Sequence, residues 1–333
     1  VSSDDSYEEA DIYRRTVVMV EVDDNVSYGV DFFRVKGGKS HVFSFHSQSE
    51  RATAAGGLNL VPQTDADGNY KGSYAGADVP FGKDPNSPNA WTYETVYPRG
   101  YTWLKNVRRD NNPSRQFSVD FNVTDYNKAV KDSNGIHLRM TQMNDFDVNE
   151  VAIAQGKVPV KKGNEKMPEG LEYVLVTREG ENLDSLFTTV YEPYKNTRYV
   201  ESMEAVSANV IDGTEKADDA VRALKVVHTN GRTDYIVYAT NTSVTYRVDD
   251  KFDFRGFVGV YSINAENEVI YRYLNDGDII GESTGSAKSI TGTVINYQRE
   301  NSFDNYIDVS MASDDIEKVI GKYIFISNDG VQN

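Results

Sequence analysis

The feature of this chain that most restricts its fold is a hydrophobic spacing of two, repeated in many short runs. Within one such run, Val30 and Phe32 fall on one face of an extended strand, and Phe33 and Val35 fall on the other. Apolar residues on both faces predict a strand that is covered on both sides. Similar runs rich in Val, Ile, Tyr, Phe and Thr occur at 14–22, 117–123, 171–177, 185–194, 222–229, 233–240, 243–249, 256–263, 267–274, 292–297 and 322–327.

Turn residues separate these runs. Gly37-Gly38 divides the stretch 30–46 into two expected strands, and Asn-Gly pairs stand at Asn134-Gly135 and Asn230-Gly231. Asn-Gly between strand-like runs is a strong hairpin signal, because both residues tolerate a positive φ. Helical patterns are few, and we expect only brief helices at 125–131, 214–224 and 313–320.

These patterns predict an all-β fold, with a large antiparallel β-sandwich of the supersandwich kind followed by a smaller β-sandwich domain. We place the large sandwich at 1–248, with a long loop over about 50–115, and the smaller β-domain at 249–333. The chain ends just after an Asn-Asp-Gly turn, where a returning strand is expected. We therefore expect a fragment of a larger protein.

Composition excludes several classes of function. The chain has no Cys, so it has no disulfide, no thiolate metal site and no cysteine nucleophile. No stretch approaches about 18 uncharged apolar residues, so no membrane span is expected. With 35 basic and 51 acidic residues the net charge is −16, which argues against nucleic acid or anionic lipid as the main partner.

Four parts of the chain, in order, resemble one enzyme family. VDFFRVKGGKSHVFSFHS at 30–47 resembles the motif D-x-F-R-V-x-G-G-x-x-H-x-x-x-x-H of the heparinase II/III-like polysaccharide lyases. GYTWLKNVRRDNNPSRQFSVDFNV at 100–123, followed by GIHLRMTQM at 135–143, resembles the part of these enzymes that follows a long aromatic-rich loop. REGENLDSLFTTVYEPY at 178–194 and HTNGRTDYIVYAT at 228–240 resemble two later stretches of the family.

The resemblance implies an enzyme that cleaves uronate polysaccharides by β-elimination. That reaction needs a group that neutralises the uronate carboxylate, a base and an acid. Family members carry a catalytic Asn and Tyr on an N-terminal helical toroid, and a catalytic His in an H-G-H-x-D-like motif that also supplies metal ligands. This chain has no run that could build the toroid, and it lacks the motif. We therefore expect the C-terminal β-sandwich part of such an enzyme, forming one wall of the cleft, with no catalytic residue or metal ligand of its own.

The partners implied are an acidic polysaccharide (a glycosaminoglycan or another uronate polymer) and the upstream toroid of the same polypeptide. The implied location is secreted or at the surface of a bacterial cell. No cofactor is expected in this chain, and the use of a divalent metal by the intact enzyme stays open. Enzyme activity is uncertain, and the chain alone is expected to be inactive. The alternative is a non-catalytic carbohydrate-binding or cell-surface β-sandwich.

A basic and aromatic stretch is the best candidate for contact with a polysaccharide. Residues 95–115 hold five basic side chains against one acidic side chain, a local charge of 5 − 1 = +4. Guanidinium groups bind carboxylates through paired hydrogen bonds, and aromatic rings stack on sugar faces. The candidate residues are Arg99, Tyr101, Trp103, Arg108 and Arg109. The alternative is a solvated loop whose rings pack on the sandwich, and the sequence leaves both open.

Two histidines, His41 and His46, are further candidates for substrate contact. They lie five positions apart, so a regular strand places them on opposite faces, and we do not expect them to chelate one metal. We favour structural roles, with His46 a partly buried imidazole at a strand end. Asp31 and Arg34 are expected to form ion pairs with neighbouring strands, because their separation also puts them on opposite faces.

Overall fold

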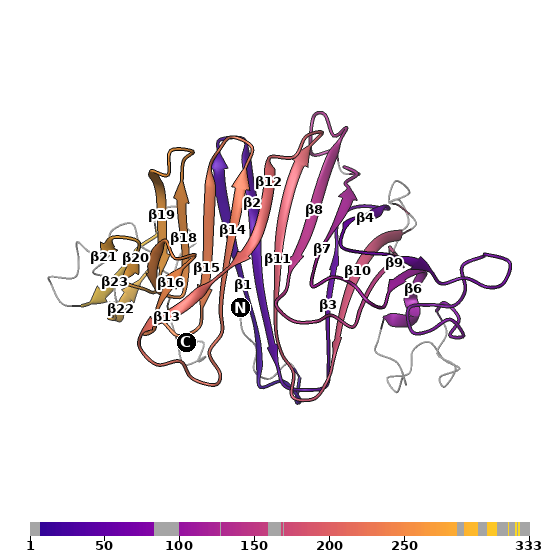
Figure 1. Ribbon diagram of the computed structural model, residues 1–333, viewed down its shortest axis with the longest axis horizontal. Helices are drawn as coiled ribbons and strands as arrows, with labels where there is room; N and C mark the ends of the chain where they lie inside the picture. Colours follow the sequence, from indigo (N-terminus) through magenta and orange to yellow (C-terminus); the bar gives the residue numbers. More distant parts are fainter. Residues whose placement is uncertain are drawn as a thin grey trace. The chain divides into compact units, whose positions relative to one another are not determined.

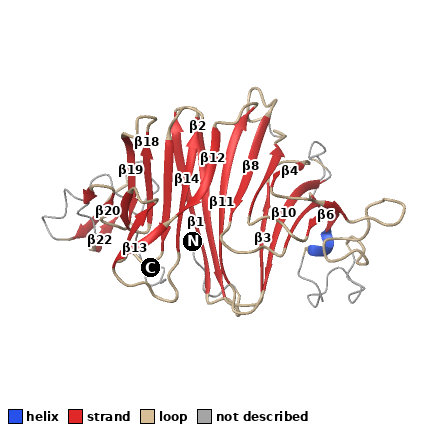
Figure 2. Cartoon of the chain, in the orientation of Figure 1, coloured by secondary structure: helices blue, strands red, loops and turns tan. Residues whose placement is uncertain are grey.

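The computed structural model describes residues 7–82, 100–126, 128–158, 168, 170–284, 290–298, 305–311, 319, 324 and 326. Strands dominate this part of the chain, together with one 3-10 turn, η1 (Tyr101–Trp103) (Figures 1 and 2). The predicted all-β fold is confirmed. The expected helix at 214–224 is wrong, because its last residues begin a strand, and the described residues of 125–131 are irregular. The helix expected at 313–320 lies outside the described residues, apart from Val319.

The chain forms two compact units. The first comprises Val1–Glu204 with Val227–Asn230, and the second comprises Ala205–Val226 with Gly231–Asn333. The division expected between 248 and 249 falls inside the second unit, in the turn between β16 (Thr245–Val248) and β17 (Phe252–Arg255). These two strands pair with each other, so ladder hydrogen bonds join the two sides of the expected boundary. Across the residues described, no helix is long and apolar enough to cross a membrane.

A six-stranded antiparallel sheet forms the base of the first unit (Figure 1). Its strands, in spatial order, are β1 (Ile12–Asp23), β2 (Val26–Lys36), β11 (Asp184–Lys195), β8 (Ile136–Met143), β7 (Gln116–Asn122) and β4 (Ala52–Gly56). Phe33 pairs with Phe187, and Val119 pairs with Met140. Directly paired residues project from the same face, so these side chains belong to one apolar face.

A five-stranded antiparallel sheet packs on that face. Its strands, in spatial order, are β3 (Ser40–His46), β10 (Gly170–Glu179), β9 (Glu150–Lys157), β6 (Leu104–Asp110) and β5 (Val61–Pro62). Phe43, Ile153 and Val174 from this sheet are buried in one cluster with Phe33 and Phe187 from the other. The ring of Phe187 lies 5.7 Å from that of Phe43 and 6.3 Å from that of Phe33. The first unit is therefore a β-sandwich with an aromatic centre.

The segment expected as a long loop at 50–115 contributes strands to both sheets. β4 pairs with β7, and β5 pairs with β6. Between β5 and β6, Tyr74 packs with Leu104, Val107 and Leu175, and its hydroxyl lies 3.1 Å from Oγ1 of Thr177. These contacts lie on the face of the five-stranded sheet that points away from the central core. The described part of this segment thus covers that face.

The chain crosses from one sheet to the other at Gly37-Gly38. β2 and β3 flank this turn without pairing to each other, because β2 belongs to the six-stranded sheet and β3 to the five-stranded one. Both glycines have positive φ, 98° and 71°. The Gly37 amide donates to the Leu183 carbonyl oxygen at 2.8 Å, which fixes the turn against the start of β11. As predicted, β2 is buried on both faces, from Tyr28 to Val35.

Two further five-stranded sheets and one two-stranded sheet hold the remaining strands. Their orders are β12 (Val200–Val206), β14 (Val221–His228), β15 (Thr233–Ala239), β18 (Val258–Ile263), β19 (Val269–Asn275); β13 (Ala208–Asp212), β16, β17, β20 (Ile279–Ile280), β21 (Ser283–Thr284); and β22 (Thr293–Tyr297), β23 (Ile307–Ser310). The second unit has its own core, which includes Tyr235, Phe252 and Phe254. The Asn230-Gly231 pair joins the neighbouring strands β14 and β15, as the hairpin signal predicted.

Replacing Gly37 with alanine should destabilise the first unit by about 1–3 kcal/mol, because φ is positive and a Cβ atom would collide with the Glu9 carbonyl oxygen. Gly56→Ala is the matched control, since a Cβ atom there meets nothing within 4 Å, and its effect should stay within about 1 kcal/mol. Urea unfolding of both variants measures the difference. Equal stabilities would show that the Gly37 turn does not constrain the corner between the sheets.

Candidate functional site

Arg108 and Arg109, the two arginines predicted to contact substrate from a long loop, lie in strand β6 and are held by carboxylates of neighbouring strands. Arg108 Nη2 lies 2.7 Å from Oε1 of Glu172, and the two side chains are 24% and 14% exposed. Arg109 Nη1 lies 2.6 Å from Oε1 of Glu150, and its guanidinium carbon lies 4.7 Å from the ring centre of Tyr74. Both guanidinium charges are therefore neutralised by carboxylates of adjacent strands, and their proposed contact with substrate stays a prediction.

The predicted aromatic residues lie beside these arginines in η1. Tyr101 packs edge-on against Tyr74, with ring centres 4.7 Å apart, and is half-buried. Trp103 is 46% exposed, and its ring centre lies 5.7 Å from that of Phe81. The Lys105 amine lies 5.7 Å above the Phe81 ring. The rings thus divide between the two alternatives, since Tyr101 packs on the sandwich and Trp103 is open to solvent; Arg99 lies outside the described residues.

The two histidines of β3 occupy opposite faces of the strand, as predicted. His41 is buried, with Nδ1 2.9 Å from Ser185 Oγ and Nε2 2.5 Å from the Gly37 carbonyl oxygen. His46 is exposed at the strand end, and its ring stacks obliquely on Tyr173 at 4.5 Å. His41 therefore braces the corner between the sheets, whereas His46 is more open than the partly buried residue we expected.

The other two residues interpreted as structural form ion pairs on opposite faces of β2. Asp31 is fully buried and receives Arg15 Nη2 at 2.5 Å. Arg34 is 2% exposed and donates to Asp184 of β11 at 2.7 Å. Burial raises the pKa of Asp31, and the bonds from Arg15 oppose this shift. Both pairs join neighbouring strands of the six-stranded sheet, as expected.

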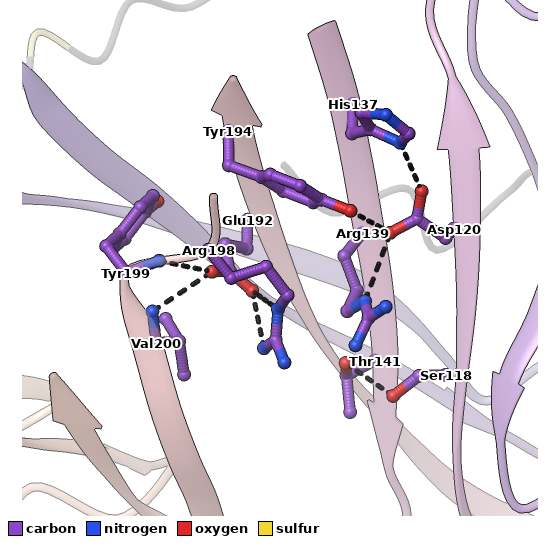
Figure 3. Close-up of polar contacts among 10 residues, drawn as sticks. All are labelled: Ser118, Asp120, His137, Arg139, Thr141, Glu192, Tyr194, Arg198, Tyr199 and Val200. Atoms are coloured by element: carbon purple, nitrogen blue, oxygen red, sulfur yellow. Dashed lines mark hydrogen bonds and ion pairs between the residues drawn. The ribbon is translucent and has the colours of Figure 1, made fainter. Parts of the chain in front are cut away.

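A different group of polar side chains gathers on the six-stranded sheet, on the face opposite the core (Figure 3). β7, β8 and β11 are neighbours there, and alternate residues of each strand point to this face. In the register, Asp120 stands opposite Arg139, and Arg139 stands opposite Glu192. His137 likewise stands opposite Tyr194. The pairing of three strands thus assembles these groups from distant parts of the chain.

Asp120 lies at the centre of this group. Its Oδ1 accepts from His137 Nδ1 at 2.6 Å, and its Oδ2 accepts from the Tyr194 hydroxyl at 2.6 Å and from Arg139 Nε at 3.2 Å (Figure 3). The rings of His137 and Tyr194 stack with centres 5.0 Å apart and planes at 13°. We call these four residues the Asp120 cluster. One carboxylate therefore fixes the orientation of an imidazole, a phenol and a guanidinium.

A second carboxylate, Glu192, lies beside the Asp120 cluster and is only 1% exposed. Its Oε2 accepts from Arg198 Nε at 2.8 Å and from Arg198 Nη2 at 2.6 Å. Its Oε1 accepts from the backbone amides of Tyr199 at 3.2 Å and Val200 at 3.0 Å (Figure 3). Four hydrogen bonds compensate the burial of this charge and fix the segment between β11 and β12.

The electrostatics of the site favour a protonated Tyr194. Burial, and then the hydrogen bond to Asp120, raise the pKa of its phenol to about 12. The positive charges of Arg139 and Arg198 oppose this shift of the Tyr194 pKa. At neutral pH Tyr194 is therefore a hydrogen-bond donor and not a base.

The Asp120 cluster and Arg198 are accessible to a ligand. The side chains of His137 and Arg198 are 30% and 29% exposed, and that of Arg139 is 19% exposed. Within the described part of the chain, neither terminal nitrogen of Arg139 has a hydrogen-bond partner, and Arg198 Nη1 has none. The site thus offers N–H groups that could donate hydrogen bonds to an oxygen-rich ligand. Among the described residues, no group of three or more His, Asp or Glu side chains could hold a metal ion.

None of the residues of this site is among the candidates predicted from the sequence. A usable signal was present, because polar residues alternate with apolar ones at Ser118 and Asp120 and again at His137, Arg139 and Thr141. This alternation predicts one polar face on each strand. It does not predict that β7 and β8 pair, nor that Asp120 meets Arg139, since pairing depends on the register between strands.

The chain is thus an all-β protein. Its first unit is an antiparallel β-sandwich, and one outer sheet face of this sandwich carries polar side chains that include Arg139. No protein-family model matches the chain, and no curated protein matches it.

Replacing Glu192 with alanine should destabilise the protein by about 3–5 kcal/mol, because Arg198 and two backbone amides lose their common acceptor. Glu201→Ala removes an exposed carboxylate and should change the free energy of unfolding by no more than about 0.5 kcal/mol. Urea unfolding of the two variants compares them. A small loss for Glu192→Ala would mean that water replaces its hydrogen bonds.

The corner histidine gives the fold a dependence on pH. Burial lowers the pKa of His41 in the folded protein, whereas the unfolded chain takes up the proton near about pH 6.5. The stabilising contribution of neutral His41 is therefore complete above about pH 6.5 and is lost as the pH falls through the lower, folded-state pKa. Between about pH 7.5 and 5.5, urea unfolding should show a larger loss of stability for the wild type than for His41→Asn. Parallel curves would contradict this assignment.

Proposed function

We propose that this chain is the β-sandwich region of a polysaccharide lyase that acts on uronate polysaccharides by β-elimination. In this proposal the sandwich forms one wall of the substrate cleft, and the principal catalytic groups lie in another part of the polypeptide. The protein would be secreted or exposed at the cell surface. The observation that carries the proposal is the partly exposed Asp120 cluster with Arg198, on a sheet face that a polymer chain could approach.

The chemistry of the site supports this role. A uronate polymer presents carboxylates and many hydroxyl groups, and it is recognised by guanidinium groups and by oriented hydrogen-bond donors and acceptors. Arg139 and Arg198 supply the guanidinium groups, and His137 supplies an imidazole whose Nδ1 side is fixed by Asp120. Tyr194, held protonated, suits binding better than removal of the C5 proton. This supports a wall that binds substrate without supplying the base.

A second candidate function is a non-catalytic carbohydrate-binding module. The exposed ring of Trp103, with Lys105 beside Phe81, favours this alternative. Trp103 and the Lys105 amine both contact the Phe81 ring, and such a group of an exposed indole and a cation fits an anionic sugar, whether or not the protein cleaves it. The two candidates differ in turnover and not in binding.

Incubation with several uronate polysaccharides, followed by the ultraviolet absorbance of unsaturated products, tests the lyase proposal. The parent polypeptide, including its upstream region, should release unsaturated ends, and the present chain alone should not. Turnover by the chain alone would contradict the absence of the main catalytic groups. Binding without turnover by the parent polypeptide would replace the lyase with the carbohydrate-binding module.

A further inference from the structure

We infer that Arg139 and Arg198 form a binding site for the carboxylate of a single uronic acid residue, and that Glu192 is the positioning residue of this site. The inference rests on the proposed function in taking a sugar acid as the ligand. It goes beyond that function by assigning the recognition of acidic sugars to two arginines and to a fixed geometry.

The two arginines are brought together by the strand register. Arg139 of β8 stands directly opposite Glu192 of β11, and Glu192 holds Arg198 through two hydrogen bonds of 2.8 and 2.6 Å. Tyr194, two residues after Glu192 on β11, donates to the same Asp120 oxygen as Arg139 does. Figure 3 shows the two side chains lying on the same face of the sheet. A ligand on this face therefore meets both.

Each guanidinium group is held on one side and open on the other. Asp120 accepts from Arg139 at Nε, and within the described residues the two terminal nitrogens of Arg139 have no partner. Glu192 accepts hydrogen bonds from Nε and Nη2 of Arg198, and within the described residues Nη1 has no partner. A planar carboxylate accepts N–H bonds from such open edges in a fixed geometry. Because the arginines are already oriented, little conformational entropy is lost when the ligand binds.

The charge balance of the site makes geometry the source of recognition. Asp120 and Glu192 carry two negative charges, and Arg139 and Arg198 carry two positive ones, so these four groups sum to zero. The site does not attract a polyanion through excess charge, which agrees with the net charge of −16 for the chain. A lysine at position 198 would keep the charge but lose the fork of N–H donors. Substitution by lysine therefore separates directed binding from general electrostatics.

Isothermal titration calorimetry on this chain tests the inference. The probes are oligosaccharides of galacturonic, mannuronic and glucuronic acid, each compared with its methyl ester, which removes the carboxylate charge, adds a methyl group and keeps the sugar hydroxyls. At least one acid should bind, and the affinity for its ester should be lower by at least about tenfold. Equal affinity for acid and ester would overturn the carboxylate site and leave carbohydrate binding intact. Failure of all three acids to bind would overturn it as well.

The variants assign the binding to the two arginines. Arg139→Gln, Arg198→Gln and Arg198→Lys should each weaken binding of the acid by about tenfold or more, with no change for the ester. Arg247→Gln is the matched control, because Arg247 is a partly exposed arginine paired with Asp253 in the second unit, and it should bind as the wild type does. Full affinity in Arg198→Lys would contradict directed recognition. Full affinity in both glutamine variants would overturn the site.

The positioning role of Glu192 needs its own readout. Glu192→Gln keeps the volume of the side chain but weakens the hold on Arg198, so binding of the acid should fall while binding of the ester stays unchanged. Near-ultraviolet circular dichroism measures whether each variant is folded. If Glu192→Gln unfolds, Arg139→Gln still tests the binding site, because it leaves Glu192 intact. Unchanged affinity in a folded Glu192→Gln would remove the positioning role. Cleavage by the parent polypeptide is a separate measurement, so a lyase without this site, or this site without lyase activity, is recognisable.

Discussion

The packing of the six-stranded sheet on the five-stranded sheet, around Phe187, is the interaction on which the rest of the first unit depends. Side chains alternate along each strand, so the residues that enter this core fix the orientation of their neighbours on the opposite face. Val119 and Phe121 are buried in the core, which turns Asp120 to the other face. Met140 does the same for Arg139 and Thr141. The apolar core therefore determines where the polar site lies.

Buried and half-buried ion pairs are the second constraint. Arg15 with Asp31, Arg108 with Glu172 and Arg109 with Glu150 each place at least one partner largely out of water. Removing one partner of such a pair leaves a desolvated charge, so these arginines are tied to structural roles as firmly as core residues are. Within the segment of local charge +4, Arg108 and Arg109 are neutralised in this way by Glu172 and Glu150.

The open arginine edges on the six-stranded sheet have a different origin. Arg139 and Arg198 are also held by carboxylates, but they are held from one side only, on a face that is partly exposed. A site of this kind is oriented before the ligand arrives and has no excess charge. The function proposed for the chain is contact with a uronate polymer. It depends on arginines that keep N–H groups available for a ligand, in contrast to arginines that are neutralised inside the fold.

The sequence by itself determined that the chain is all-β, where about half of the strands lie, that Asn230-Gly231 joins a hairpin, and that His41 and His46 point to opposite faces. These properties follow from alternation and turn chemistry, which act over a few neighbouring residues. Only the tertiary structure decided that β2 and β3 belong to different sheets, that Glu150 and Glu172 neutralise Arg109 and Arg108, and that Asp120 meets Tyr194. The last two residues are separated by 74 positions. Contacts of this range are set by strand order and register, and a local pattern is compatible with many registers until the core selects one.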